Sequence, residues 1–112
     1  ASPTVVVVQA QLDAYNARDI DAFMATFHPE AELFSIDDPT PRASGHEAVR
    51  AIYADLFERS PGLHSELVNR MTVGNRVLDH ERITGREGGG VLEIVMVYEV
   101  EDGAIRRAWS IR

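Results

Sequence analysis

The spacing of apolar residues changes abruptly near residue 60, and this change constrains the fold more than any other feature of the sequence. Before it, apolar residues recur every three or four positions, as they do on one face of a helix. After it, β-branched segments over 63–73, 75–85, 91–100 and 104–111 are separated by glycine-containing turns. Helices followed by an antiparallel meander predict an α+β fold, in which the helices cover one face of a curled sheet.

The first 60 residues contain three helical patterns and one strand pattern. Ser2 can cap a helix that has Pro3 at its first position, and Asp19 can cap a second, short helix that His28-Pro29 ends. Two prolines, at positions 39 and 41, predict a loop before the third helix. We therefore expect helices over about 3–17, 19–27 and 46–59, and a strand over 31–36.

Length and composition limit the function classes. A chain of 112 residues is one domain, 1–112, and its net charge of −7 repels nucleic acid and anionic membranes. The absence of cysteine excludes thiolate nucleophiles, disulfides and zinc–sulfur sites. The apolar run Val5–Val8 is far shorter than a membrane span and has no basic flank. We expect a soluble, cytoplasmic domain with neither nucleic acid nor membrane as a partner.

Charges predict the register of the hairpin formed by 75–85 and 91–100. Two cross-strand ion pairs form on one face if Arg82 lies opposite Glu93 and Arg76 lies opposite Glu99. The other face then carries acidic residues among apolar neighbours, and it should meet the helices. Burying an ionised carboxylate costs several kcal/mol, so we expect these acids to be paired or to have a raised pKa.

The last hairpin receives its register from Gly103. This glycine suits a type I turn followed by a bulge after Glu101-Asp102. The turn would place Arg107 beside Met96 and Trp109 beside Ile94, on the inner face of the sheet.

Asp79, Glu81 and Arg107 would then lie on three neighbouring strands of that inner face. Two interpretations remain open. In one, Arg107 neutralises Asp79 and Glu81 reaches solvent at the rim of the sheet. In the other, the three side chains line a ligand cavity as an acid, a base or an orienting pair.

The outer face of the sheet carries an apolar strip next to His80. Monomers seldom expose such a face, so we expect a second copy of the chain to cover it in a homodimer. Its members are Leu78, Val91, Val95, Val97 and Ala108.

No metal or cofactor motif is present in the sequence. The four histidines, at positions 28, 46, 64 and 80, show neither HxH nor HExxH spacing. The glycines at 88–90 are followed by no Lys-Ser/Thr pair and no helix, so they are a turn and not a phosphate loop. We expect no metal and no cofactor.

Several short motifs resemble those of the nuclear transport factor 2-like superfamily, and most of all its SnoaL-like and steroid delta-isomerase-like families. The resemblance covers essentially the whole chain. It implies a cone-shaped barrel of curled sheet and helices, with an apolar pocket, usually in a homodimer. The motifs are Asp19-Ile20-Asp21-Ala22, Phe27 to Leu33, Gly45 to Val49, Tyr98 to Ile105 and the closing Trp109.

The catalytic residues of ketosteroid isomerase transfer poorly to this chain. That enzyme uses an Asp base, with a Tyr and a protonated Asp as its oxyanion hole. Its tyrosine position falls on Gln11 here, and its base falls on Ser35 or, with an insertion, on Asp38. The second Asp falls near Met96, beside which Asp79 is expected. The Arg-x-Asp of the family's epoxide hydrolases is also absent from 77–84.

These observations predict an enzyme of the SnoaL or ketosteroid isomerase type. It would act as an isomerase, cyclase or hydrolase on a small apolar substrate, by acid–base chemistry without a cofactor. The candidate bases are Asp79 and Asp38, with Glu81 as a second acid–base group. The alternative is a non-catalytic hydrophobic-ligand-binding or dimeric scaffold module. Expected substrate contacts are Tyr15, Phe27, Phe34, Tyr53, Phe57, Met71, Met96, Tyr98, Arg107 and Trp109.

Overall fold

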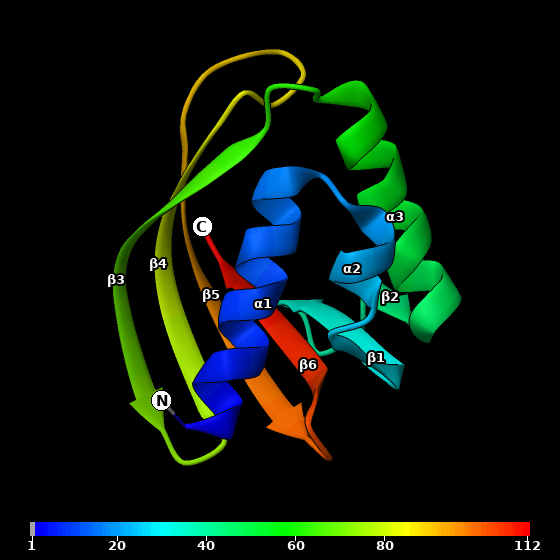
Figure 1. The fold of residues 1–112 in the computed structure, drawn as a ribbon, viewed down its shortest axis with the longest axis vertical. Coiled ribbons are helices and arrows are strands. Elements are labelled where there is room, and N and C mark those ends of the chain that lie inside the picture. Colours follow the sequence, from blue (N-terminus) through cyan, green and yellow to red (C-terminus); the bar gives the residue numbers. More distant parts are fainter. Residues whose placement is uncertain (1) are drawn as a thin grey trace.

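Three helices pack against one face of a six-stranded sheet in the computed structural model, which describes residues 2–112 (Figure 1). The sheet curls around α1, while α2 and α3 cover its other end. The helices are α1 (Pro3–Ala17), α2 (Ile20–Met24) and α3 (His46–Arg59). The strands are β1 (Phe27–Ser35), β2 (Ala43–Ser44), β3 (His64–Val73), β4 (Arg76–Thr84), β5 (Leu92–Glu101) and β6 (Ala104–Ile111).

The expected caps begin the first two helices. The Ser2 hydroxyl accepts a hydrogen bond from the backbone N–H of Val5 at 3.2 Å, and Asp19 accepts one from Ala22 at 3.1 Å. Each cap satisfies an N–H group that has no partner within its helix. The local signals therefore predicted both starts correctly.

The second helix is shorter than predicted, because the chain joins the sheet early. It ends at Met24, and Phe27 already pairs with Ile105 of β6. The N–H of Ile105 donates to the carbonyl of Thr26 at 2.8 Å. Pro29 lies inside β1, where the register shifts between Phe27 and Glu32 and a ladder N–H is not needed.

The sequence predicts a purely antiparallel sheet, but the sheet in the structure is mixed. Its strand order is β2-β1-β6-β5-β4-β3, and β1 runs parallel to β6. The strands at the two edges, β2 and β3, do not pair with each other, so the sheet is curled but unclosed. The α+β class and the helices on one sheet face are confirmed.

The predicted register of β4 and β5 is confirmed. Arg76 lies opposite Glu99 with an ion pair of 2.8 Å, and Arg82 lies opposite Glu93 at 3.5 Å. Glu81 and its neighbours on alternate positions therefore face the helices, as expected.

The predicted register of β5 and β6 is wrong. The turn consists of Asp102 and Gly103 alone, both with positive φ (54° and 75°), so Glu101 pairs with Ala104. A bulge next to Val100 then shifts the ladder. As a result Arg107 lies opposite Glu99 and Trp109 opposite Val97, and both side chains belong to the outer face.

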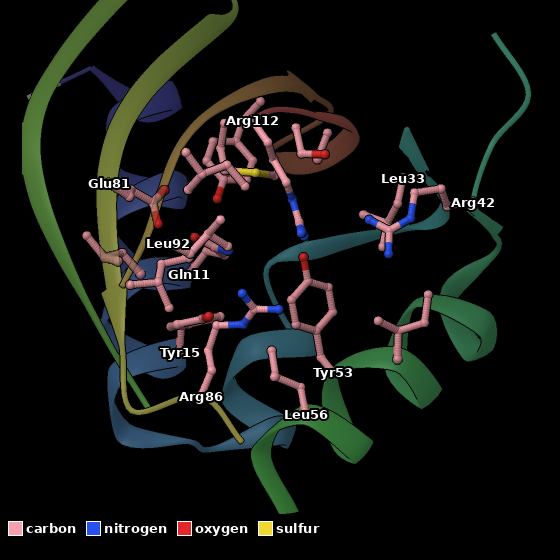
Figure 2. A pocket seen from close by; sticks show the side chains of 18 of the residues that line it. Gln11, Tyr15, Leu33, Arg42, Tyr53, Leu56, Glu81, Arg86, Leu92 and Arg112 are labelled. Carbon is pink, nitrogen blue, oxygen red and sulfur yellow. The ribbon is translucent and has the colours of Figure 1, made fainter. Parts of the chain in front are cut away.

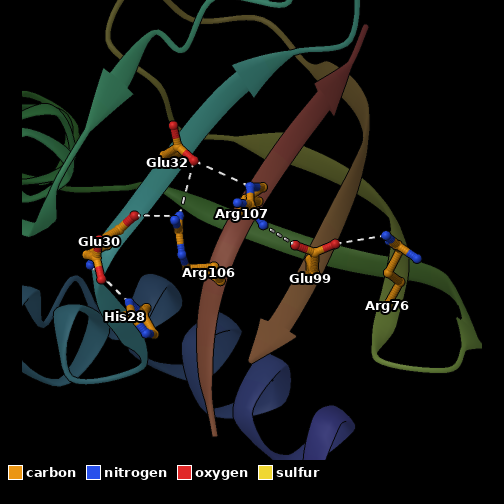
Figure 3. A network of polar contacts seen from close by, with 7 residues as sticks. All are labelled: His28, Glu30, Glu32, Arg76, Glu99, Arg106 and Arg107. Atoms are coloured by element: carbon orange, nitrogen blue, oxygen red, sulfur yellow. Dashed lines mark hydrogen bonds and ion pairs between the residues drawn. The ribbon is translucent and has the colours of Figure 1, made fainter. Parts of the chain in front are cut away.

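A ladder of alternating charges crosses this outer face (Figure 3). Arg107 bridges Glu32 of β1 at 3.3 Å and Glu99 of β5 at 2.7 Å, and Glu99 also binds Arg76 of β4. Arg106 adds a contact of 3.1 Å to Glu32. The ladder joins four neighbouring strands.

The apolar part of the outer face differs from the prediction in more residues than Trp109. Ala108 is buried on the inner face, opposite Tyr98. Met71, expected at the pocket, lies opposite Leu78 on the outer face and is 53% exposed. Val91 is also exposed.

The core between helices and sheet is built on aromatic rings. Tyr15, Phe23, Phe27, Tyr53 and Phe57 form a continuous cluster with ring centroids 4.5 to 6.5 Å apart. The cluster ties α1, α2 and α3 together at one end of the sheet. No helix within residues 2–112 has the length and apolar character that crossing a bilayer requires.

Candidate functional site

A cavity of about 540 Å³ lies between α1, α3 and the inner face of the sheet (Figure 2). This volume is within the range of small-molecule sites. Its apolar wall consists of Leu12, Leu33, Phe34, Ala51, Ile52, Leu56, Ile83, Leu92, Ile94, Met96 and Ala108. Its polar groups come from Gln11, Tyr15, Arg42, Tyr53, Asp55, Arg59, Glu81, Arg86, Tyr98, Ser110 and Arg112.

Glu81 is the buried carboxylate of this cavity. It is only 5% exposed, and its Oε1 accepts a hydrogen bond from the Ser65 hydroxyl at 2.6 Å. No Arg or His within residues 2–112 forms an ion pair with it. Burial raises the pKa of Glu81 to about 7, although the hydrogen bond from Ser65 lowers it and the charge of Asp79 raises it further. At neutral pH the group can therefore both accept and donate a proton.

Asp79 has a different environment on the same strand. It is fully buried and forms a two-pronged ion pair with Arg70, with Nε–Oδ1 at 2.7 Å and Nη2–Oδ2 at 2.9 Å. Arg70 also donates to Gln9 at 2.8 Å. Asp79 is absent from the cavity wall. The partner that neutralises it is Arg70 and not Arg107, so our first interpretation was wrong on this point.

A sequence signal for the Arg70–Asp79 pair existed. Gly74-Asn75 makes a two-residue turn, with Val73 opposite Arg76, and this register continues to Arg70 opposite Asp79.

Three tyrosines present hydroxyl groups at the cavity. Burial raises the pKa of Tyr53 to about 12, and it raises those of Tyr15 and Tyr98 above their ordinary value as well. All three hydroxyls thus keep their protons at neutral pH and can donate hydrogen bonds. In Figure 2 the Tyr53 hydroxyl extends from α3 into the cavity. These donors are suited to an oxygen that gains negative charge.

The other expected substrate contacts are divided between the cavity, the core and the outer face. Met96 lines the cavity. Phe34 also borders it, although its ring stacks on Trp109 of the outer face, with centroids 5.5 Å apart. Phe27 and Phe57 are buried in the aromatic cluster and are absent from the cavity wall.

Three further expected site residues are absent from the cavity wall. Arg107 and Trp109 belong to the outer face, because the turn and bulge of the last hairpin turn them outward. Asp38 lies in the exposed segment after β1, where its Oδ1 accepts a hydrogen bond from the N–H of Thr40 at 2.9 Å.

Sequence reasoning missed the arginines of the cavity and the hydrogen-bond donor to Glu81. Arg42, Arg86 and Arg112 come from segments outside the regular elements, where no periodicity assigns a direction to a side chain. Ser65 approaches Glu81 because a bulge in β3 shifts the register between Leu67 and Asn69. Neither feature had a local sequence signal.

One group of possible metal ligands is found in the described part of the chain. Atoms of His28, Glu101 and Asp102 lie within 4.8 Å of one another at the surface. None of the three lines the cavity. Exposed acidic groups of this kind are common without a metal, so we assign no metal to it.

The fold and the cavity place the chain in the nuclear transport factor 2-like and cystatin-like class. An uncharacterized cystatin-fold protein from Novosphingobium aromaticivorans has a TM-score of 0.89 and 26% identity, over all of both chains. A putative polyketide cyclase from Sinorhizobium meliloti has a TM-score of 0.80 and 22% identity, over 94% of this chain and 93% of that one. A putative SnoaL-like polyketide cyclase from Jannaschia has a TM-score of 0.78 and 22% identity, over 97% and 84%.

The family follows from the sequence match. The model of the SnoaL-like domain matches residues 8–108, which is most of the chain. The protein therefore belongs to the SnoaL-like domain family. No curated protein matches its sequence significantly.

Proposed function

We propose that this protein is a SnoaL-type enzyme that performs acid–base chemistry on a small, largely apolar molecule in the cavity, without a cofactor. Glu81 would be the proton acceptor and donor. The observation that carries this proposal is a buried carboxylate at the wall of an apolar cavity, with a pKa near 7 and no ion-pair partner among residues 2–112. Two of the similar structures are putative polyketide cyclases, and a polyketide is a substrate of the same kind.

The proposed reaction begins with removal of a proton from a carbon next to a carbonyl group. The proton goes to Glu81. The electron pair of the C–H bond forms a C=C bond, and the carbonyl oxygen takes up the negative charge of the resulting enolate. The hydroxyls of Tyr53 and Tyr98 would donate hydrogen bonds to that oxygen. Return of the proton to another carbon completes an isomerisation. In a cyclisation the enolate carbon attacks a second carbonyl, and the oxygen of that carbonyl takes the proton back from Glu81.

Asp79 would act on this chemistry only through Glu81. Its negative charge raises the pKa of Glu81, and Arg70 holds it in place. It is therefore a positioning residue in the proposal and not a catalytic one. Asp38 has no role in it, since its side chain is exposed outside the cavity wall.

Proton exchange tests the role of Glu81 without knowledge of the final product. Apolar ketones, 1,3-diketones and lactones are incubated with the protein in D₂O, and deuterium uptake next to the carbonyl is followed by mass spectrometry. We expect Glu81→Gln to lower the exchange rate by about 100-fold or more. Glu93→Gln on the outer face is the matched control and should keep the rate. An unchanged rate in Glu81→Gln would refute the assignment.

A binding or scaffold module remains the second candidate function. It is favoured by Gln11, which stands in the cavity where the isomerase tyrosine was expected. Such a module would bind apolar compounds, raise its melting temperature in their presence and catalyse no proton exchange in any of them.

We also propose that the protein forms a homodimer through the outer face of its sheet and that it is cytoplasmic. The dimer is supported by the apolar side chains of Leu78, Val95 and Val97, which line up across β4 and β5 and are only partly covered within one chain. A second copy would cover them.

A further inference from the structure

The arginines of this protein divide into paired and unpaired groups. All 11 basic residues are arginine, and seven of them form ion pairs with carboxylates. Arg18 donates instead to the carbonyl oxygens of Asn16 and Leu63. Among the arginines of residues 2–112, the remaining three, Arg42, Arg86 and Arg112, form neither an ion pair nor a side-chain hydrogen bond.

All three unpaired arginines line the cavity. They come from three separate segments: the loop before β2, the loop between β4 and β5, and the end of β6. Figure 2 shows the guanidinium group of Arg112 extending toward the Tyr53 hydroxyl and that of Arg86 beside the Tyr53 ring, with Arg42 on the side away from Glu81. Arg42 and Arg112 are also close enough to Tyr53 to oppose the rise of its pKa.

Two of these arginines are held by their neighbours. Gly85 has a φ of 75° and packs so closely that a Cβ there would lie 1.9 Å from the carbonyl oxygen of Gly62. The N–H of Glu87 donates to the Ser60 hydroxyl at 2.9 Å. Arg86 stands between these two anchors. The N–H of Arg42 donates to the carbonyl of Leu33 at 2.7 Å, which ties its loop to β1.

This concentration of positive charge is unexpected in a protein of net charge −7. Of the two acidic residues that the described part of the chain places at the cavity, Asp55 is paired with Arg59, and Glu81 forms no ion pair there. Like charges gathered at one cavity repel one another and favour an anion among them. A guanidinium donates two parallel hydrogen bonds to a carboxylate, which suits this group in particular.

We propose that the ligand of this cavity is an apolar acid, whose carboxylate binds to Arg42, Arg86 and Arg112 while its apolar body extends along the sheet toward Glu81. This inference rests on the proposed function and specifies its substrate class. The neutral part of the molecule would contact Ile83, Ile94 and Met96. The carboxylate would orient it, so that the reacting carbon and not the acid group faces Glu81.

A pair of probes that differ only in charge tests the proposal. The affinities of 2-naphthoate and 2-naphthamide are measured by isothermal titration calorimetry at low ionic strength. We expect naphthoate to bind at least about tenfold more tightly, since hydrogen bonds to charged groups are stronger than neutral ones. The preference should shrink as salt is added.

Substitutions locate the preference at the arginines. In Arg42→Gln/Arg86→Gln/Arg112→Gln the two affinities should become equal within about twofold, while that of naphthamide stays unchanged. Arg50→Gln/Arg76→Gln/Arg82→Gln removes the same charge from ion pairs outside the cavity and should keep the preference. If the first triple variant does not fold, Arg42→Gln alone, at an exposed position, should lower the preference in the same direction.

The outcomes separate this proposal from the proposed function. Equal affinities in the wild type, a preference that survives in the arginine variant, or no binding of either probe would each overturn it. Glu81→Gln should keep the preference for naphthoate and lose proton exchange. A wild type that prefers naphthoate but exchanges no protons would refute the enzyme and leave the acid-binding cavity intact.

Discussion

Glu81 makes the stability of this protein dependent on pH in a direction that the structure specifies. Its pKa is about 7 in the folded protein and 4.5 when exposed in the unfolded chain. Between these two values the folded state binds more protons at Glu81 than the unfolded state does. Because the unfolded state binds fewer protons, the free energy of unfolding falls as pH rises through this window.

The magnitude follows from the size of the shift. Each pKa unit corresponds to about 1.4 kcal/mol, so burial of the ionised Glu81 costs about 3 kcal/mol above pH 7. Glu81→Gln removes the charge, and its amide oxygen can still accept a hydrogen bond from Ser65. We therefore expect the variant to gain about 3 kcal/mol relative to the wild type when the pH is raised from 4.5 to 8.

Urea denaturation of both proteins across this pH range measures the effect. The difference between variant and wild type isolates Glu81, because the remaining titratable groups are common to both. Glu93→Gln, at the surface of the same sheet, is the control for the loss of a carboxylate outside the cavity. A flat difference for Glu81→Gln would refute the raised pKa, and with it the main support for Glu81 as an acid–base group.

Two further predictions concern the buried ion pair and the outer face. Arg70→Gln should lower the free energy of unfolding by about 3 to 5 kcal/mol in urea denaturation, because Asp79 would stay buried without its partner. Adding Asp79→Asn should restore part of this loss, and a loss below about 1 kcal/mol would contradict a buried pair. If two chains associate through the outer face, Val97→Asp should shift sedimentation from dimer to monomer, whereas Glu66→Gln on the edge strand should not. A wild type that sediments as a monomer would refute the dimer.

Local signals explain which parts of the fold could be predicted. The caps at Ser2 and Asp19, and the ion pairs of Arg76 and Arg82 across one hairpin, depend on residues that are close in sequence or joined by a short turn. Their energies are available before the chain has any tertiary structure. These parts of the prediction were confirmed.

The site was predicted less well, because a turn or bulge that differs by one residue from the expected one reverses which face of the sheet a side chain occupies. The last hairpin turns on Asp102-Gly103 and contains a bulge, and this register reverses the faces of Arg107 and Trp109. The parallel pairing of β1 with β6 joins segments that are about 75 residues apart in the chain, as in Phe34 opposite Trp109. No short-range pattern encodes such a contact.

The sequence by itself determined the α+β class, the helix starts and the inward direction of Glu81, because periodicity, capping and cross-strand charge are local properties. Only the tertiary structure decided what surrounds that carboxylate. It paired Asp79 with Arg70, gave Glu81 no ion pair within the described chain, and brought Arg42, Arg86 and Arg112 from distant segments to one cavity. The charge of a site depends on how these segments pack together, and packing is settled only when the whole chain has folded.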